Sequence, residues 1–215
     1  MQLHENFEKQ ERTKRRLQEA FMQLYKKTPL ERIAVRQIAE LAGVTRSTFY
    51  VYYDSVYGIL EAIENELQEG MGKYFEKYSE DMLERGEEGG PLADYGALEP
   101  YESNIKWFEY CRQHRDYLLI LLGPHGDPSF EYKLRKNLKV DINRMMDEDG
   151  MLNDYLRDYF VEYVVGATLS LMRYWLERAD LSAEEVVIVV NMIRQSKLVV
   201  NQMHSKSSDG ENHKK

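Results

Sequence analysis

Apolar residues recur three and four positions apart along nearly the whole chain, and this spacing predicts an all-α protein. The first helix is expected over residues 12–27, with its apolar face formed by Leu17, Ala20, Phe21, Leu24 and Tyr25. The run VVIVV at 186–190 resembles a strand in isolation. Ser182 and Glu185 form a capping box directly before it, and this places the run in a helix.

Two short helical patterns and one long one follow the first helix. Residues 35–42 predict a second helix, with Ile38, Leu41 and Ala42 facing inward. Gly43 comes where a helix C-cap needs a positive φ, and Thr45 is suited to cap a third helix over residues 46–52. A longer fourth helix is expected from about residue 55 to residue 83.

The remainder of the chain predicts a larger helical domain. Residues 84–100, ERGEEGGPLADYGALEP, have the composition of a linker, and the polar tail 204–215 is expected to be disordered. Further helices are predicted over residues 101–111, 116–122, 130–146, 151–179 and 182–203. We therefore expect three parts: a helix-turn-helix domain over residues 1–55, a larger helical domain over residues 56–203, and the tail over residues 204–215.

The two closing helices indicate a second subunit. The helix over residues 182–203 is apolar nearly all round, so it must be covered on more than one side. One seam of the preceding helix carries Leu152, Tyr155, Tyr159, Tyr163, Gly166, Ser170 and Tyr174. A second subunit is the simplest source of the cover that the last helix needs.

The charge of the chain is unevenly distributed. The 215 residues carry a net charge of −8. The first 53 residues hold ten Lys and Arg against six Asp and Glu, whereas the remaining 162 residues have an acidic excess of 12. A basic head on an acidic body is compatible with DNA binding, because phosphate contact needs only one positive face.

The segment 35–53, VRQIAELAGVTRSTFYVYY, predicts a helix, a glycine turn and a short helix. Ala39, Ala42 and Gly43 are small enough for two helices to cross closely, while Phe49 and Tyr53 anchor the third helix. The exposed positions of that helix would be Thr45, Arg46, Ser47, Thr48, Tyr50 and Tyr52. Such hydrogen-bonding side chains suit a helix in the DNA major groove, although an ordinary three-helix bundle with a polar face has the same pattern.

From Thr13 to Leu60 the chain resembles the TetR/AcrR family of transcriptional regulators. The similarity rests on TKRRLQEAF, on Pro29, Leu30 and Ile33, on QIAELAGVTRSTFYVYY and on the pair Ile59–Leu60. The stretch LLILLGPHGDPSFEYKLRKNL at 118–138 and the later GATLSLMRYWLERA resemble the C-terminal region of one TetR subgroup.

The resemblance implies a set of DNA-contacting residues. Those on the recognition helix and its cap would contact bases and phosphates, and the start of the second helix and the first helix would contact phosphate. The implied residues are Lys14, Val35, Arg36, Thr45, Arg46, Ser47, Thr48, Tyr50 and Tyr52. One departure is clear, since Val56 stands where the family commonly has a phosphate-binding lysine, and Gly58 weakens the same turn.

The resemblance also implies that residues 56–203 form a regulatory and dimerisation domain, and that a homodimer forms through the helices over residues 151–179 and 182–203. It implies as well a small-molecule effector, bound in the C-terminal domain, that changes the affinity for operator DNA, with repression the commoner mode. Aromatic residues and a methionine there suggest a site for a flat or lipophilic molecule, though core packing explains the same composition. The candidate ligand residues are Trp107, Phe108, Tyr110, Tyr117, Tyr159, Tyr163 and Met172.

Other functions have weaker support. His114, His125 and Asp127 lack an obvious arrangement as metal ligands, and we expect no metal or cofactor. Catalytic motifs are absent from the sequence, and Cys111 lies in a helical pattern that favours burial. No apolar run is long enough for a membrane span, so a cytoplasmic protein is expected. A co-regulator whose C-terminal domain binds another protein is the alternative.

Overall fold

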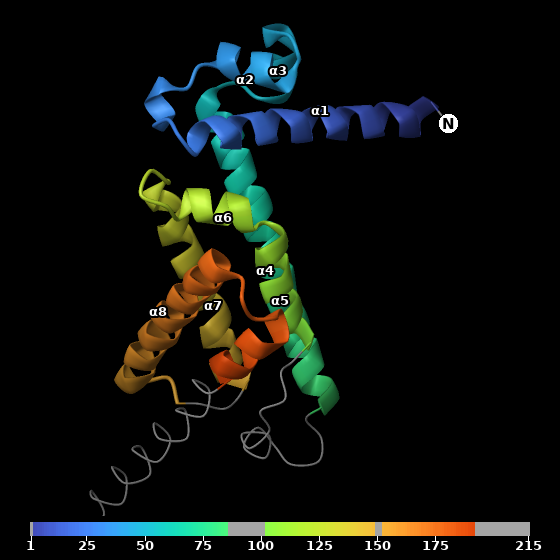
Figure 1. Cartoon of the computed structure of the whole chain (residues 1–215). Helices are drawn as coiled ribbons and strands as arrows, with labels where there is room; N and C mark the ends of the chain where they lie inside the picture. Colours follow the sequence, from blue (N-terminus) through green and yellow to red (C-terminus); the bar gives the residue numbers. More distant parts are fainter. Residues whose placement is uncertain (1, 86–101, 149–151, 192–215) are drawn as a thin grey trace, which may run out of the picture. The chain divides into compact units, whose positions relative to one another are not determined.

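The structure, a computed structural model, describes residues 2–85, 102–148 and 152–191, and these are helical or lie in turns (Figure 1). An all-α fold is therefore confirmed for the described residues. The predicted linker core 86–100, the second half of the last helix and the tail 204–215 lie outside them. The helices are α1 (Gln2–Tyr25), the 3-10 helix η1 (Leu30–Arg32), α2 (Val35–Ala42), α3 (Arg46–Tyr52), α4 (Val56–Arg85), α5 (Glu102–Gln113), α6 (Arg115–Leu121), α7 (Pro128–Glu148) and α8 (Tyr155–Arg178), followed by helical residues 183–191.

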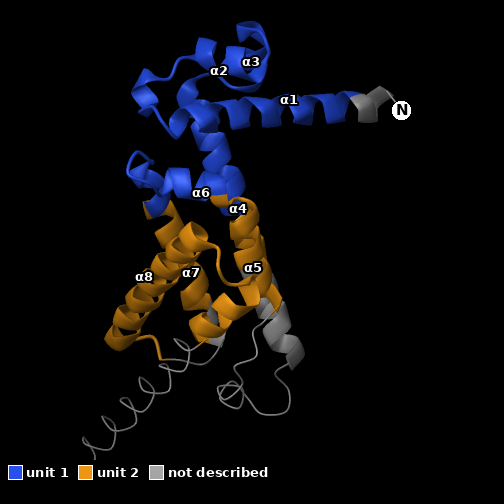
Figure 2. Cartoon of the chain, viewed as in Figure 1, with its two compact units in different colours: residues 1–69, 116–131 blue, residues 70–115, 132–215 orange. Residues whose placement is uncertain are grey.

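The chain divides into two compact units that do not follow chain order (Figure 2). Unit 1 consists of residues 1–69 and 116–131, so it holds α1 to α3, the first part of α4 and most of α6. Unit 2 consists of residues 70–115 and 132–215. The expected functional boundary after residue 55 stays a prediction, since these units describe packing only.

The core of unit 1 is made by the predicted apolar faces. Leu17 and Phe21 of α1, Ile38 of α2, Phe49 of α3 and Ile59 of α4 are all fully buried. Helices α2 and α3 lie together on one side of α1 (Figure 1). This packing holds the short helix α3, because a seven-residue helix is too short to be stable by itself.

Helix α1 is longer at its start than the predicted 12–27. It begins at Gln2, and residues 6–12 are exposed, including Phe7 at 61%. The prediction used apolar periodicity, which a solvent-exposed turn does not have. Residues 2–11 nonetheless favour helix, because they include glutamates, glutamines and a lysine and contain neither Gly nor Pro.

The turn between α2 and α3 agrees with the sequence prediction in two respects and differs in one. Gly43 has a φ of 63°, and the Thr45 hydroxyl accepts a hydrogen bond from Thr48 N at 3.1 Å, so both caps are confirmed. Leu41, however, is 51% exposed, and its inward orientation was wrong. The buried arc of α2 runs from Ile38 through Ala42 to Ala39, and at roughly 100° per residue Leu41 lies about 60° outside the Ile38 edge of this arc.

Unit 2 is built from the rest of α4 with α5, α7, α8 and residues 183–191. Its aromatic core includes Phe108, whose ring makes edge contacts with Trp107 and Trp175 at 4.9 and 5.6 Å between centroids. Arg115 closes the far end of α8 by donating hydrogen bonds to the carbonyls of Leu176 and Glu177. The run at 186–190 is helical, and the predicted capping box is formed in both directions between Ser182 and Glu185.

A buried arginine joins α7 to the start of α8. The Arg157 side chain is 1% exposed and donates to Asp147 Oδ1 at 2.7 Å and to Asn143 Oδ1 at 3.1 Å. Asp154 caps α8 by accepting from the amides of Leu156 and Arg157. A buried charge needs such partners, and these contacts fix how the two helices meet.

Candidate nucleic-acid interface and regulatory residues

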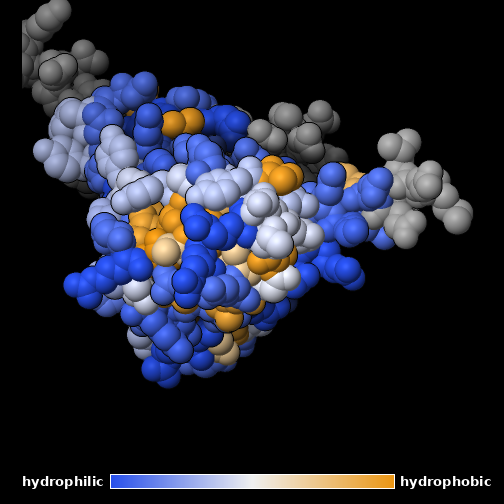
Figure 3. Space-filling model, turned by 90° about the horizontal axis from the view of Figure 1, so that it is seen from above, coloured by the Kyte–Doolittle hydropathy of each residue, from blue (hydrophilic) through white to orange (hydrophobic). Residues whose placement is uncertain are grey.

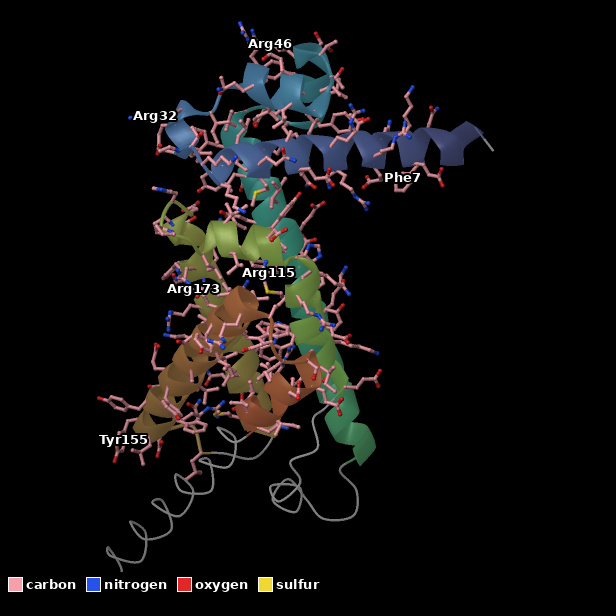
Figure 4. All side chains as sticks on the ribbon, viewed as in Figure 1. Phe7, Arg32, Arg46, Arg115, Tyr155 and Arg173 are labelled. Atoms are coloured by element: carbon pink, nitrogen blue, oxygen red, sulfur yellow. The ribbon has the colours of Figure 1, made fainter. Side chains whose placement is uncertain are left out.

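Helix α3 has one buried and one exposed side. Phe49 is fully buried and Tyr53, just after the helix, is 7% exposed, so both anchor α3 as predicted. Arg46, Ser47 and Tyr50 are exposed, and the Arg46 side chain extends outward from the start of the helix (Figure 4). The exposed arc spans about 140° of the helix and presents a cation and two hydroxyl groups.

Two predicted contact residues of this segment, Thr45 and Thr48, have a structural role as well. The hydroxyls of Thr45 and Thr48 are 2.9 Å apart and bond to each other, so capping occupies both. Thr48 and Tyr52 are half-buried, whereas Thr45 is exposed. The free hydrogen-bonding groups of α3 are therefore concentrated on Arg46, Ser47 and Tyr50.

The start of α2 carries two of the predicted phosphate contacts, Val35 and Arg36. Its N-cap residue is Ala34, which has no side-chain acceptor for the first helical amides. Gln37 instead accepts from Ala34 N at 2.8 Å. Val35 is half-buried, and Arg36 is exposed and pairs with Glu40 at 2.9 Å between Nε and Oε1.

An arginine of α1 closes the other end of α2, and the sequence analysis did not find it. Arg16 donates through one guanidinium nitrogen to the carbonyls of Ala42 and Gly43. A cation is favourable at a helix C-terminus, where carbonyl groups lack helical partners. The only sequence signal is a basic residue on α1 beside the apolar face, which does not reveal its partner.

Lys14, a predicted phosphate contact, is already paired within unit 1. Its ammonium group donates to Glu66 Oε1 of α4, and Gln18 Nε2 donates to Glu66 Oε2 at 2.7 Å. Glu66 also lies close enough to Tyr53 and Tyr117 to raise the pKa of both hydroxyls, after the larger effect of burial. The cluster thus connects α1, α4 and α6.

The structure at the start of α4 explains the glycine of this turn but not Val56. The Ser55 hydroxyl accepts from Gly58 N at 3.0 Å and donates to Asp54 Oδ1 at 3.0 Å. A Cβ on Gly58 would lie 2.2 Å from the same carboxylate oxygen, so glycine makes room for Asp54. An acidic group therefore lies near Val56, and this turn contributes no cation.

The surface that is seen from above, on the side of α1, α2 and α3, is mainly hydrophilic and has a few exposed hydrophobic side chains (Figure 3). On α2 and α3 the exposed aliphatic residues are Leu41 and Val51, at 51% and 78%. Val51 lies at one edge of the exposed arc of α3, one turn after Ser47. The sequence analysis did not include it among the contact residues.

The candidate effector residues do not gather in one place. Trp107, Phe108 and Met172 are buried in unit 2, at 4%, 2% and 0% exposure. Tyr110 packs against α4, where a Cβ on Gly70 would lie 2.0 Å from its hydroxyl oxygen. Three further candidates lie elsewhere: Tyr117 in unit 1, and Tyr159 and Tyr163 on the exposed face of α8.

The exposed face of α8 is the predicted seam. Tyr155, Tyr159, Tyr163 and Tyr174 are between 56% and 75% exposed, and Tyr155 extends outward from the helix (Figure 4). A Cβ on Gly166 would meet nothing within 4 Å, so the packing of this chain does not require a glycine there. A row of exposed tyrosines interrupted by small residues is the kind of surface that protein interfaces use.

Other kinds of site find little support in the described residues. Within them, no group of three or more His, Cys, Asp or Glu could hold a metal ion. Cys111 is fully buried, as predicted, and burial raises the pKa of its thiol, which disfavours the reactive thiolate. None of the helices in the described part of the chain is long and apolar enough to cross a membrane.

Comparison with protein families finds a match in the C-terminal half. Residues 99–195 match a TetR family model described as "Transcriptional regulator C-terminal region". A curated relative from Bacillus subtilis strain 168, "Uncharacterized HTH-type transcriptional regulator YxbF", is 22% identical over 177 residues. The match covers 80% of this chain and 41% of the relative, so the chain spans less than half of that protein's length.

Solved structures show the same fold. A TetR transcriptional regulator from Streptococcus agalactiae 2603V has a TM-score of 0.57 at 20% identity, covering 89% of this chain and 98% of that one. FadR from Bacillus subtilis, in complex with stearoyl-CoA, has a TM-score of 0.52 at 14% identity, covering 83% and 95%. The matched proteins are transcriptional regulators rather than enzymes.

Proposed function

We propose that this chain is a transcriptional regulator of the TetR family and that it acts as a dimer that binds a specific operator sequence. The family match over residues 99–195 and the shared fold support this proposal. We further propose that it is a repressor and that an effector bound in the C-terminal domain, residues 56–203, changes its affinity for the operator. The exposed arc of α3 is the observation that carries the DNA-binding proposal.

The contacts on this arc divide by chemistry. Arg46, Ser47 and Tyr50 combine a bidentate donor with two hydroxyl groups, and these can read base edges in the major groove. Arg36 and the amides at the start of α2 would bind phosphate, as would Thr45 and Tyr52. Phosphate contacts fix the register of α3, while the arc supplies the sequence preference.

The geometry of DNA supports the dimer proposal. Two recognition helices must be held about 34 Å apart to enter successive major grooves. The exposed tyrosine row of α8 supports pairing through this helix and residues 182–203. Residues 181, 188 and 189 add apolar side chains that are each between 37% and 42% exposed.

The effector proposal rests on the buried part of the candidate set, Trp107, Phe108 and Met172. Apolar and aromatic side chains would accept a lipophilic molecule, and FadR provides an example of the same fold with stearoyl-CoA. The chain has two tryptophans, Trp107 and Trp175, both buried in unit 2, so their fluorescence reports on this region. Saturable change with stearoyl-CoA, but not with coenzyme A, supports a lipophilic effector; no change with either excludes this acyl-CoA.

DNA binding is tested by fluorescence anisotropy. Duplexes selected from a random pool with the purified protein are titrated beside a scrambled duplex at two salt concentrations. We expect specific binding that weakens with salt, by about 0.9 in log–log slope for each phosphate contact. The Arg46→Ala and Tyr50→Phe variants should each bind the selected duplex more weakly, with a loss of about 1–3 kcal/mol in binding free energy.

The control is Tyr132→Phe, which removes a hydroxyl from an exposed tyrosine of α7 in unit 2. It should bind the selected duplex as the unmodified protein does. Equal, weak binding of the selected and scrambled duplexes would reject the operator-binding proposal and leave the co-regulator alternative.

A further inference from the structure

Val51 is the most exposed large hydrophobic residue in the described part of the chain. Its side chain is 78% exposed, although it lies within α3 and between two aromatic residues in sequence. Its neighbours Phe49 and Tyr53 are buried, so the orientation of Val51 follows from the anchoring of the helix. The outward position is therefore fixed by the fold.

Nothing in the fold itself favours valine at this position. A side chain this exposed contributes little to the hydrophobic core. A β-branched residue is also less favourable in a helix than alanine, because its χ1 angle is restricted. An isolated exposed aliphatic residue is common on protein surfaces, but this one lies on the face proposed to enter the major groove.

The helical geometry places Val51 beside the polar readers. It follows Ser47 by four residues and therefore lies one turn further along the same side of α3. Arg46 and Tyr50 form the neighbouring row of the exposed arc. The arc thus has a polar row next to a row that ends in an aliphatic group.

The valine side chain has no donor or acceptor, so it cannot pair with a phosphate or with a polar base edge. The one group in the major groove that favours apolar contact is the 5-methyl of thymine. We propose that Val51 is a specificity-determining residue that contacts a thymine methyl group in each operator half-site. The inference rests on the proposed DNA-binding function and names one base that the arc prefers.

A double-mutant cycle between protein and DNA tests this contact. Each thymine of the selected duplex is replaced in turn by deoxyuridine, in both half-sites, which removes only the methyl group. Affinities of the full-length protein and of Val51→Ala are measured on each duplex. We expect one position where uracil in place of thymine lowers the affinity of the unmodified protein by about fourfold per half-site. At that position the replacement should leave the affinity of Val51→Ala unchanged.

The matched control is Leu41→Ala, which shortens the exposed aliphatic residue of α2. It should show the same loss at that thymine as the unmodified protein. If Val51→Ala retains the full uracil effect at every position, or if the half-site has no thymine, the proposal fails while specific binding and its dependence on Arg46 stand. If no duplex is bound specifically, the proposed function fails and the Val51 contact with it.

Discussion

At the residue scale, the buried hydroxyl of Tyr25 has an unusual protonation equilibrium. Its pKa is raised to about 12, first by burial and then by the charges of Asp127, Glu64 and Glu31. At neutral pH the hydroxyl is therefore protonated in both the folded and the unfolded chain, and it does not lower the free energy of unfolding. Deprotonation in the unfolded chain begins near pH 10, two units below the folded value.

We predict that the protein loses stability between pH 10 and pH 12 in part through Tyr25. In this window the unfolded state releases a proton that the folded state retains, so the free energy of unfolding falls, by about 2–3 kcal/mol at most. Denaturant unfolding at pH 8, 10 and 12 should show a smaller alkaline loss for Tyr25→Phe. An identical alkaline loss in both proteins would contradict the assignment.

A second prediction at this scale concerns Gly43. Its φ of 63° costs an L-residue about 1–2 kcal/mol, and an added Cβ would lie 2.7 Å from an Arg16 nitrogen. Gly43→Ala should lower the free energy of unfolding by at least this amount in urea titration. Gly72→Ala is the control, because its Cβ meets nothing within 4 Å and alanine favours helix by about 1 kcal/mol. Equal effects of the two substitutions would refute the role of the turn.

At the scale of elements, the sequence predicted α2 and α3 with their bounds and caps, because each carries a local signal. Gly43, Thr45 and the apolar spacing each report the conformation of their own neighbours. The start of α1 was missed because an exposed polar helix has no apolar stripe. Leu41 was misplaced because hydrophobicity was taken as inward orientation, whereas the helical angle sets it outward.

The candidate site was predictable only where roles follow from one helix. The exposed positions Arg46, Ser47 and Tyr50 could be found from the anchoring of Phe49. Contacts between elements could not, because Arg16 with the end of α2 and Lys14 with Glu66 join residues 26 and 52 positions apart. The scatter of the effector candidates has the same cause, since composition does not specify which face an aromatic residue occupies.

Glu66 yields a prediction about DNA affinity. Its carboxylate forms an ion pair with Lys14 and adds a negative charge to unit 1. In Glu66→Gln the charge is lost and Lys14 is released toward phosphate, so we expect tighter DNA binding and a salt slope larger by about 0.9. Anisotropy at several salt concentrations measures both. Weaker DNA binding with an unchanged salt slope would contradict this prediction and show that the Lys14–Glu66 pair is needed for the packing of unit 1.

At the scale of the whole molecule, the proposed function requires a dimer, because one operator with two half-sites is bound by two copies of α3. Tyr159 is the most exposed tyrosine of the α8 row, at 75%, and Tyr132 on α7 is 68% exposed. A charge placed in an interface core is costly, whereas at an exposed site it has little effect.

We predict that Tyr159→Glu shifts the protein from dimer to monomer in sedimentation-equilibrium measurements, while Tyr132→Glu leaves the dimer intact. The dissociation constant of the dimer should rise by at least tenfold in Tyr159→Glu, since one buried unpaired charge costs several kcal/mol. A monomeric unmodified protein, or a dimer insensitive to Tyr159→Glu, would place the interface elsewhere.

The most direct test of the central claim is a hydroxyl-radical footprint of the protein on its selected operator. The account predicts two protected half-sites related by two-fold symmetry, with centres one helical turn or a multiple of it apart. Arg46→Ala should remove both protected regions together. A single protected patch without symmetry, or protection that persists in Arg46→Ala, would contradict a dimer that reads DNA through α3.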